Sequence, residues 1–331
     1  MRRLKVGVIG LGFMGELHAR VQSQIPTFDL VAVADIDAAR AREIAGRLGC
    51  EAHADYAQLL ARPEIEAVTI VTPDRHHVAP AVAAAKAGKH ILLEKPMAHD
   101  GAAAREIGAA VEAAGVRLMV GHVLHFDPRY AQIRDAAKRG DLGQVITARA
   151  KRNCPRGLPA RVGKVTSILY YLGVHDIDML QQTAGPIVRV DARRVQKLGL
   201  AEEDALYAVL EFRSGAIGLL DYNWSWPDGL PYGYLAQLEV IGTETAAFLD
   251  VRDQGLWFVG ADGPKGADTH LWPEINGRIV GDLRDEVLHF AEAVITGRPF
   301  VQDWKDARDA IFVIDALFAS LNEGGPVEVR R

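Results

Sequence analysis

Cysteine is scarce in this chain of 331 residues, which has only Cys50 and Cys154. Two cysteines cannot build a disulfide framework or a cysteine-rich metal site, and such scarcity is typical of proteins from a reducing cytoplasm. The chain also lacks an apolar run long enough to cross a bilayer, and a strand pattern begins at residue 4, which leaves no room for a signal peptide. We therefore expect a cytoplasmic protein without a membrane anchor.

An excess of charge of one sign is missing as well. The formal net charge is -5, and hydrophobic residues make up 49% of the chain and charged residues 24%, as in ordinary globular proteins. This balance gives no reason to expect binding to nucleic acid or to an anionic membrane. Internal repeats and low-complexity segments are absent from the sequence, and its length favours two domains with separate cores.

A glycine-rich turn follows the first apolar segment, Leu4–Ile9, and precedes a stretch compatible with a helix, Glu16–Gln24. In a dinucleotide-binding turn, Gly10 allows the tight bend, Gly12 lets the backbone approach a pyrophosphate, and Gly15 lets the helix pack against the strand. The phosphates then meet the free N–H groups of a helix N-terminus. The sequence predicts that phosphate binding begins at residue 10.

The second half of this fingerprint is an acidic residue at the end of the next strand. Leu30–Ala34 reads as a buried strand, and Asp35 closes it twenty residues after Gly15. A carboxylate there accepts a hydrogen bond from the adenosine ribose 2'-hydroxyl and repels a 2'-phosphate, which favours NAD over NADP. Arg40 favours NADP instead, because an arginine near this position can accommodate the 2'-phosphate.

Strands and helices alternate over roughly the first 120 residues, which predicts a doubly wound parallel sheet of the Rossmann type, an α/β fold. After residue 126 strand patterns recur with short turns, which predicts an α+β domain with a large, mainly antiparallel sheet. Two amphipathic helices, Val280–Ile295 and Lys305–Glu323, close the chain. We expect a dinucleotide-binding domain at residues 1–123 and a second domain at 124–331.

Polar residues follow two of the predicted parallel strands. Thr72 and Pro73 end one strand, and Glu94, Lys95 and Pro96 end the next, so both groups should reach the carboxyl edge of the sheet where the cofactor binds. Lysines are usually solvated surface charges. A partly desolvated Lys95 near the nicotinamide would have a lowered pKa and could transfer a proton near neutral pH.

A second group of functional side chains is predicted within the helix expected over Ser167–Ala184. Tyr171, His175 and Asp178 are four and three residues apart, and this spacing places them on one helix face. Asp178 could orient the imidazole while its other nitrogen faces a substrate hydroxyl, as a general acid or base requires. The alternative is a structural histidine whose hydrogen bonds are satisfied by the carboxylate.

Taken together, these segments resemble the glucose-fructose oxidoreductase and inositol 2-dehydrogenase (Gfo/Idh/MocA) family of NAD(P)-dependent oxidoreductases over the full length. The most specific pieces are Glu94-Lys95-Pro96 and the run Gly173–Asp178. The resemblance implies a C-terminal α+β substrate domain whose open sheet carries the contacts of a homodimer or homotetramer. It implies catalytic roles for Lys95 and His175 at the reacting hydroxyl. The expected cofactor-binding residues are Gly10, Leu11, Gly12, Phe13, Met14, Gly15, Asp35, Ile36, Thr72, Pro73, His77, Glu94 and Lys95.

Two positions depart from the family pattern. Many members that oxidise inositols or sugars have an aspartate four residues before the histidine, where this chain has Tyr171, and the usual arginine before Phe126 is His125. Tyrosine can donate a hydrogen bond or stack on a sugar ring, but it supplies no negative charge. The expected substrate is a sugar, an inositol or a sugar derivative, and the tentative substrate residues are His122, Arg152, Arg156, Tyr171 and His175.

A basic stretch without acidic residues follows the boundary region, and its cations are Arg149, Lys151, Arg152, Arg156, Arg161 and Lys164. Such a run is usually a solvated surface, although one or two arginines could bind a carboxylate or phosphate through forked hydrogen bonds.

The histidines and aspartates near the expected pocket match no standard zinc spacing, so we expect no metal.

The sequence therefore favours an NAD-dependent dehydrogenase that acts on a secondary CH–OH group. Two alternatives stay open. Some members of the family keep NAD bound and cleave glycosidic bonds without net redox change, but the extended glycine and histidine motif associated with them is missing here. The second alternative is a non-catalytic regulator that binds NAD, and the presence of Lys95 and His175 argues against it.

Overall fold

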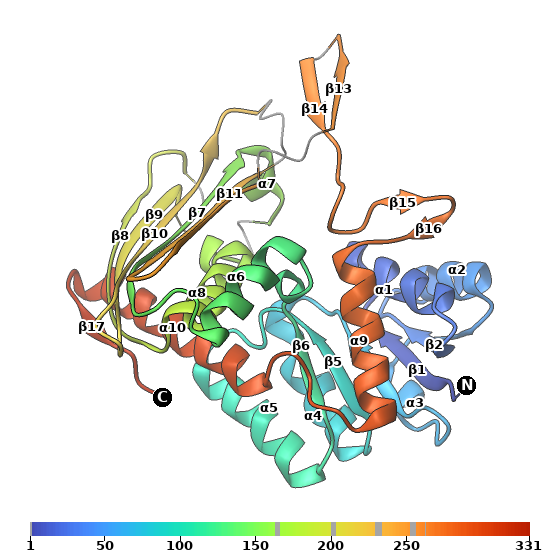
Figure 1. Ribbon diagram of the computed structural model, residues 1–331. Coiled ribbons are helices and arrows are strands. Elements are labelled where there is room, and N and C mark those ends of the chain that lie inside the picture. Colours follow the sequence, from blue (N-terminus) through green and yellow to red (C-terminus); the bar gives the residue numbers. More distant parts are fainter. Residues whose placement is uncertain (1, 163–165, 200–202, 229–233, 252–255, 262) are drawn as a thin grey trace. The chain divides into compact units, whose positions relative to one another are not determined.

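The computed structural model describes residues 2–162, 166–199, 203–228, 234–251, 256–261 and 263–331 (Figure 1). The chain forms two compact units, residues 1–126 with 270–311 and residues 127–269 with 312–331. Among the described residues, no helix has the length and apolar character needed to cross a membrane. Lys164 of the basic stretch lies outside the described residues, and so does the side chain of Arg161.

The first unit is built on a six-stranded sheet whose neighbouring strands are all parallel, in the order β3-β2-β1-β4-β5-β6. In this order β1 lies between β2 and β4, so the direction of winding reverses there, and ligands bind at the carboxyl ends of strands at such a point. The α/β expectation is confirmed. The strands are β1 (Leu4–Ile9), β2 (Phe28–Ala34), β3 (Glu51–His53), β4 (Ala67–Ile70), β5 (His90–Glu94) and β6 (Leu118–Gly121).

Three of the helices between these strands begin at an aspartate whose side chain caps the first turn. In α2, the Asp37 side chain accepts hydrogen bonds from the N–H groups of Ala39 and Arg40, and Gly49 ends the helix in the left-handed conformation with φ 72°. The helices are α1 (Phe13–Gln24), α2 (Ala38–Leu48), α3 (Tyr56–Leu60), α4 (Val78–Lys86) and α5 (Gly101–Ala114), with 3-10 turns at η1 (Asp74–His76) and η2 (Val123–His125).

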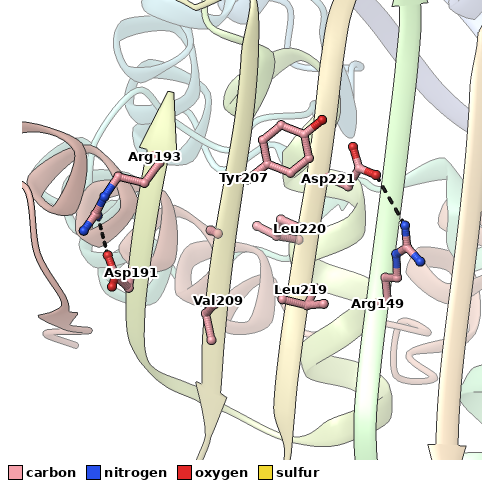
Figure 2. Close-up of a pocket in the computed structure, with 9 residues that line it drawn as sticks. Arg149, Asp191, Arg193, Tyr207, Val209, Leu219, Leu220 and Asp221 are labelled. Carbon is pink, nitrogen blue, oxygen red and sulfur yellow. Dashed lines mark hydrogen bonds and ion pairs between the residues drawn. The ribbon is translucent and has the colours of Figure 1, made fainter. Parts of the chain in front are cut away.

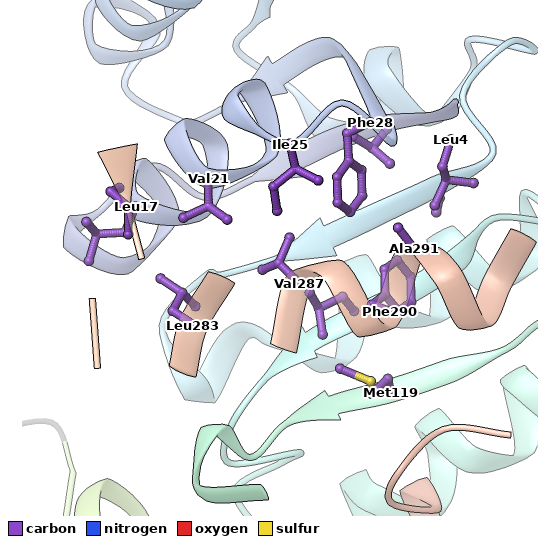
Figure 3. Close-up of a cluster of buried hydrophobic side chains, with 14 residues drawn as sticks. Leu4, Leu17, Val21, Ile25, Phe28, Met119, Leu283, Val287, Phe290 and Ala291 are labelled. Carbon is purple, nitrogen blue, oxygen red and sulfur yellow. The ribbon is translucent and has the colours of Figure 1, made fainter. Parts of the chain in front are cut away.

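A late segment of the chain returns to this first unit. After the hairpin β15 (Glu274–Ile275) and β16 (Arg278–Ile279), helix α9 (Asp282–Thr296) packs its apolar side chains against α1 and the sheet (Figure 3). Leu17 and Val21 of α1 face Leu283 and Val287 of α9 within one buried cluster. We expected a second domain at 124–331, whereas residues 270–311 belong to the first compact unit.

The second unit contains a seven-stranded sheet in the order β12-β11-β7-β10-β9-β8-β17. The pair β7 and β10 is parallel, and the other described neighbours are antiparallel, which confirms the mainly antiparallel sheet. The strands are β7 (Val145–Pro155), β8 (Ile187–Val195), β9 (Ala205–Phe212), β10 (Ile217–Trp226), β11 (Leu235–Gly242), β12 (Ala246–Asp250) and β17 (Val327–Glu328).

One face of this sheet is covered by helices of the same unit, and the other carries exposed apolar side chains. Helix α8 packs on β7 and β11, while Tyr207, Val209 and Leu219 remain 49%, 43% and 46% exposed on the opposite face (Figure 2). The remaining elements are α6 (Pro128–Arg139), α7 (Gly157–Val162), the π-helix η3 (Leu169–Gly173), α8 (Val174–Ala184), β13 (Trp257–Gly260), β14 (Gly263–Gly266) and α10 (Trp304–Glu323).

Candidate active site

The turn after β1 has the geometry that a pyrophosphate requires. Gly10 has φ +89°, and a Cβ on it would lie 2.7 Å from the carbonyl carbon of Val71. A Cβ on Gly15 would overlap the carbonyl oxygen of Gly10, whereas one on Gly12 would meet no atom of the described residues within 4 Å. Gly12 also caps α1 without a side-chain hydrogen bond. The first turn of α1 therefore has room beside Gly12 and no side-chain cap on its N–H groups, which fits the phosphates of a dinucleotide.

A pocket of about 740 Å³ lies beside this turn, at the carboxyl edge of the parallel sheet. Predicted cofactor residues from three strand ends line it together, namely Gly10, Asp35, Ile36, Thr72 and Pro73. The Ile36 side chain is 96% exposed, so it is available to pack on a bound ring. The residues present thus fit an adenosine and its ribose next to the phosphate turn.

Asp35 is tied to the glycine-rich turn. Its Oδ2 accepts a hydrogen bond from the Leu11 N–H at 2.6 Å, and its Oδ1 accepts one from the Asp37 N–H at 2.8 Å. Of the other residues expected in this turn, Leu11 is buried, Met14 is partly buried, and Phe13 is 70% exposed at the start of α1. The carboxylate is therefore held in a fixed place at the pocket wall.

Arg40, the residue that could favour NADP, is engaged elsewhere. Its guanidinium forms ion pairs with Glu16 and with Glu43, the latter at 3.1 Å, and its Nε donates to the Leu11 carbonyl at 3.3 Å. These contacts hold α2 against the start of α1. They supply a structural reason for an arginine at this position and weaken the case for a 2'-phosphate site.

The ends of β4 and β5 are joined by a buried histidine. The ring nitrogens of His77 lie 2.8 Å from the Pro96 carbonyl oxygen and 2.9 Å from the Thr72 carbonyl oxygen. His77 is 1% exposed and braces the two strand ends, and its expected contact with the cofactor stays a prediction. Lys95, at the end of β5, is partly buried, and its peptide bond to Pro96 is cis.

Glu94 has a partner that the sequence did not suggest. Its Oε1 lies 2.8 Å from Nε2 of the buried His18 in α1, and its Oε2 accepts from the Lys95 N–H at 3.1 Å. Burial opposes ionisation of Glu94, but the hydrogen bond and charge of His18 outweigh it and lower the pKa of Glu94. No spacing in the sequence connects His18 with Glu94, so only the fold brings them together.

In the second unit, the predicted histidine helix is irregular at its start. Tyr171 lies in the π-helical turn η3, while His175 and Asp178 lie in the regular helix α8 and are 7% and 1% exposed. Because a π-turn has a wider spacing than an α-helix, the shared face expected for Tyr171 and His175 does not follow from their separation of four residues. Such turns occur frequently at functional sites.

The structure also shows why this helix begins at a glycine. A Cβ on Gly173 would lie 2.8 Å from the ring of the fully buried Tyr222, so any larger residue would collide with the sheet. Asp176, between His175 and Asp178, points to β7 and receives two hydrogen bonds from Arg152, at 2.7 and 3.0 Å. This buried pair fixes the rotation of α8 about its axis.

The expected substrate residues differ in their exposure. Arg152 is 4% exposed, and its guanidinium donates to the Asp176 carboxylate. Arg156 is exposed, and its Nε donates to the Ser225 carbonyl at 2.8 Å. Tyr171 is partly buried. His122, after β6 in the first unit, is 1% exposed. Arg149 pairs with Asp221 on the exposed face of the sheet (Figure 2), as expected for a solvated charge.

Comparisons with known proteins agree with this architecture. Residues 4–122 match the family described as "Oxidoreductase family, NAD-binding Rossmann fold" (GFO_IDH_MocA), and residues 130–247 match the "GFO/IDH/MocA C-terminal domain". The chain is 30% identical over 338 residues to scyllo-inositol 2-dehydrogenase (NAD(+)) of Bacillus subtilis, covering 99% of this chain and 96% of that protein. It is 28% identical over 335 residues to myo-inositol 2-dehydrogenase of Thermotoga maritima, covering 98% of each.

Solved structures show the same similarity. An oxidoreductase domain protein from Kribbella flavida superposes with a TM-score of 0.85 at 25% identity, covering 100% of both chains. GenD2 from gentamicin A biosynthesis, solved in complex with NAD, superposes with a TM-score of 0.82 at 26% identity, covering 100% of this chain and 97% of that one. The chain therefore belongs to the Gfo/Idh/MocA family of oxidoreductases, and its first unit contains the NAD-binding Rossmann fold of that family.

Proposed function

We propose that the chain is an NAD-dependent dehydrogenase that oxidises a secondary hydroxyl of an inositol or a related sugar-like polyol. The observation that carries the proposal is the position of Lys95, directly after β5 at the edge of the sheet where parallel Rossmann sheets bind their cofactor. Full-length similarity to two inositol 2-dehydrogenases supports the substrate class. His175, near the start of α8, is the second catalytic candidate.

Oxidation of a secondary alcohol removes a hydride from carbon and a proton from oxygen. NAD, when bound, accepts the hydride. The residues of the chain manage the proton: we assign its transfer to Lys95 and His175, because amines and imidazoles near neutral pKa are effective general acids and bases. The brace from His77 to the carbonyl of Pro96, and the hydrogen bond from the Lys95 N–H to Glu94, hold the backbone on both sides of Lys95.

A neutral substrate suits the described arginines better than an anionic one. The Arg152 guanidinium is buried and paired with Asp176, so it offers no free fork to a carboxylate or phosphate. Tyr171 can donate a hydrogen bond to a polyol oxygen. Under this proposal Tyr171→Phe raises KM for the polyol with little change in kcat, and an unchanged KM would remove Tyr171 from the substrate site.

The proposal is tested by NADH formation on purified protein. Inositols, aldoses, uronates and nucleotide sugars form the panel, and Lys95→Ala, His175→Ala and the exposed-lysine control Lys86→Ala are compared with the wild type. We expect turnover of at least one neutral polyol, a loss of about 100-fold or more in kcat for the first two variants, and wild-type rates for the control. NAD affinity, measured by calorimetry, should stay unchanged in His175→Ala.

The alternatives make different predictions in the same assay. A redox-neutral glycosidase would release sugar from a glycoside without accumulating NADH. A regulator would bind NAD and keep its biological function in both Lys95→Ala and His175→Ala. Turnover of uronates or nucleotide sugars alone would contradict the preference for a neutral substrate. Arg156 would then be the candidate that binds the anionic group.

We also propose that the chain forms a homodimer or homotetramer through the exposed face of the seven-stranded sheet. Tyr207, Val209 and Leu219 from two neighbouring strands are about half exposed there (Figure 2), and apolar patches on a sheet face are typical of protein interfaces. The variant Val209→Lys with Leu219→Lys should shift the mass measured by light scattering toward the monomer. A wild-type protein that is monomeric at micromolar concentration would contradict the proposal.

A further inference from the structure

Three ionisable side chains meet inside the first unit, and none of them transfers the proton in the chemistry proposed above. His18 comes from α1, Glu94 from the end of β5 and Glu286 from the middle of α9. All three are buried, and one nitrogen or oxygen atom from each lies within 4.8 Å of the corresponding atoms of the other two. The three residues are 76 and 192 positions apart in the chain, so no sequence motif announces the group.

Glu286 is the unusual member of this group. Its side chain is 0% exposed, and neither of its carboxylate oxygens has a hydrogen-bond partner among the described residues. Its Oε1 would lie 3.3 Å from a Cβ placed on Gly121, so the glycine at the end of β6 leaves the space that the carboxylate occupies. Nδ1 of His18 likewise has no partner among the described residues. Buried polar groups are rarely left in this state.

Two buried carboxylates share one imidazole in this group. Nε2 of His18 is already engaged with Oε1 of Glu94, which leaves the Glu286 carboxylate without a hydrogen bond among the described residues. Burial and the nearby charges of Glu94 and Asp282 oppose ionisation of Glu286 and raise its pKa. A carboxyl group in this position must either stay protonated or meet a cation.

We propose that His18, Glu94 and Glu286 bind one divalent first-row transition-metal cation in a structural site that links α1, β5 and α9. One imidazole nitrogen and two carboxylate oxygens form a ligand set suited to Zn²⁺, Mn²⁺ or Fe²⁺. Two ionised carboxylates balance the two charges of the cation, and the metal takes over the contact that now joins His18 Nε2 to Glu94 Oε1. Glu94 is 8% exposed and offers the route of entry.

The metal takes no part in the hydride or proton transfer, and its main effect is on stability. It anchors α9, which returns to the first unit from the far end of the chain, and it holds Glu94 next to the backbone of Lys95. Because the metal binds only the folded chain, it stabilises the protein in proportion to the logarithm of its concentration above Kd. The melting temperature should therefore rise with added metal.

The experiment measures metal binding by the full chain. Protein freed of metal with EDTA is titrated with Zn²⁺ and, separately, with Mn²⁺ by calorimetry, and the metal content after dialysis is measured by mass spectrometry. We expect about one ion per chain, and a loss of at least about tenfold in affinity for Glu286→Gln, which keeps the size of the side chain. The control Asp285→Asn alters the adjacent, exposed acid on α9 and should bind like the wild type.

If Glu286→Gln does not fold, His18→Gln replaces it in the same titration and should show the same loss. Two results overturn the proposal. One is that the wild type binds metal weakly or at well under one ion per chain, and the other is that the ligand variants bind it as tightly as the wild type does. An infrared band of a protonated carboxylic acid that is present in the metal-supplemented wild type and missing in Glu286→Gln overturns it as well. That band would mean that Glu286 is a neutral buried acid.

Discussion

The Leu11 N–H donates a hydrogen bond of 2.6 Å to Oδ2 of Asp35, so the residue that ends β2 is fastened to the glycine-rich turn that follows β1. A second hydrogen bond, from the Asp37 N–H to Oδ1, fixes the other carboxylate oxygen. The carboxylate thus has a restrained position at the wall of the pocket shared with Gly10 and Ile36. A ribose 2'-hydroxyl can approach this group, while a 2'-phosphate meets its negative charge.

Replacing Asp35 should change the choice of cofactor. Asp35→Ala removes a charged hydrogen-bond acceptor worth about 1.5–3 kcal/mol, so NAD affinity should fall roughly 10- to 150-fold, with a much smaller loss for NADP. Calorimetric titration with both nucleotides measures the two changes. Asp35→Asn is the matched control, because it keeps an oxygen for the Leu11 N–H and removes only the charge. Equal losses for NAD and NADP in Asp35→Ala would show that Asp35 does not discriminate between them.

Two glycines of the same turn should respond differently to alanine. A Cβ on Gly12 meets no atom of the described residues within 4 Å, and its φ of -62° suits alanine, so Gly12→Ala should keep its melting temperature and lose NAD affinity. A Cβ on Gly15 overlaps the Gly10 carbonyl oxygen, so Gly15→Ala should also be destabilised, by about 1–3 kcal/mol. Thermal unfolding with and without NAD separates the two effects. A Gly12→Ala variant that binds NAD normally would contradict the placement of the phosphates.

The buried pair of Arg152 and Asp176 should contribute to stability, and Arg152 should not bind an anionic group of the substrate. Arg152→Met leaves the Asp176 carboxylate buried without its partner, which costs about 3–5 kcal/mol, whereas the exposed Arg156→Met should change stability by less than about 0.5 kcal/mol. Chemical denaturation measures both. Removal of the two charges together, in Arg152→Met with Asp176→Leu, should recover much of the loss. If Arg152→Met does not change stability, the Arg152 guanidinium of the wild type is exposed to solvent and is again a candidate for binding an anion.

Both thiols should be slow to react in the folded protein. Burial raises the pKa of Cys50 to about 11 and that of Cys154 to about 12. At pH 8 a thiol with a pKa of about 11 is ionised in roughly one molecule in a thousand, against about one in four for an unfolded cysteine. Alkylation at pH 8 should therefore be at least about 100-fold slower in buffer than in guanidinium, and should accelerate as the pH approaches 11. Comparable rates in the two solvents would mean that the thiols are exposed.

Local signals were sufficient to predict the elements beside the expected cofactor site. The apolar run Leu4–Ile9 is β1, the helical stretch Glu16–Gln24 lies within α1, and the apolar run Leu30–Ala34 lies within β2. The apolar face of α9 predicted a helix as well, but an apolar face does not identify its partner. Only the complete fold shows that Leu283 and Val287 pack on α1 (Figure 3).

The candidate site was harder to predict in detail than the fold. The π-turn before His175 ends at Gly173, which lies against the ring of Tyr222 on a strand about fifty residues later. The pairing of Arg152 with Asp176 depends on the position of β7 beside α8. Long-range packing of this kind leaves no periodic trace in the sequence. The basic stretch was therefore expected to be a solvated run with one or two anion-binding arginines, whereas Arg152 is buried against Asp176.

The central claim, hydride transfer from a polyol carbon to NAD, is tested most directly with a labelled substrate. Inositols and aldoses that carry deuterium on their carbinol carbons are incubated with the protein and NAD, and the nicotinamide is analysed by mass spectrometry. Our account predicts that reduced cofactor accumulates with one deuterium per molecule and that Lys95→Ala forms it at least about 100-fold more slowly. If NAD binds and no labelled substrate of the panel gives deuterated cofactor, the protein is not the dehydrogenase proposed here.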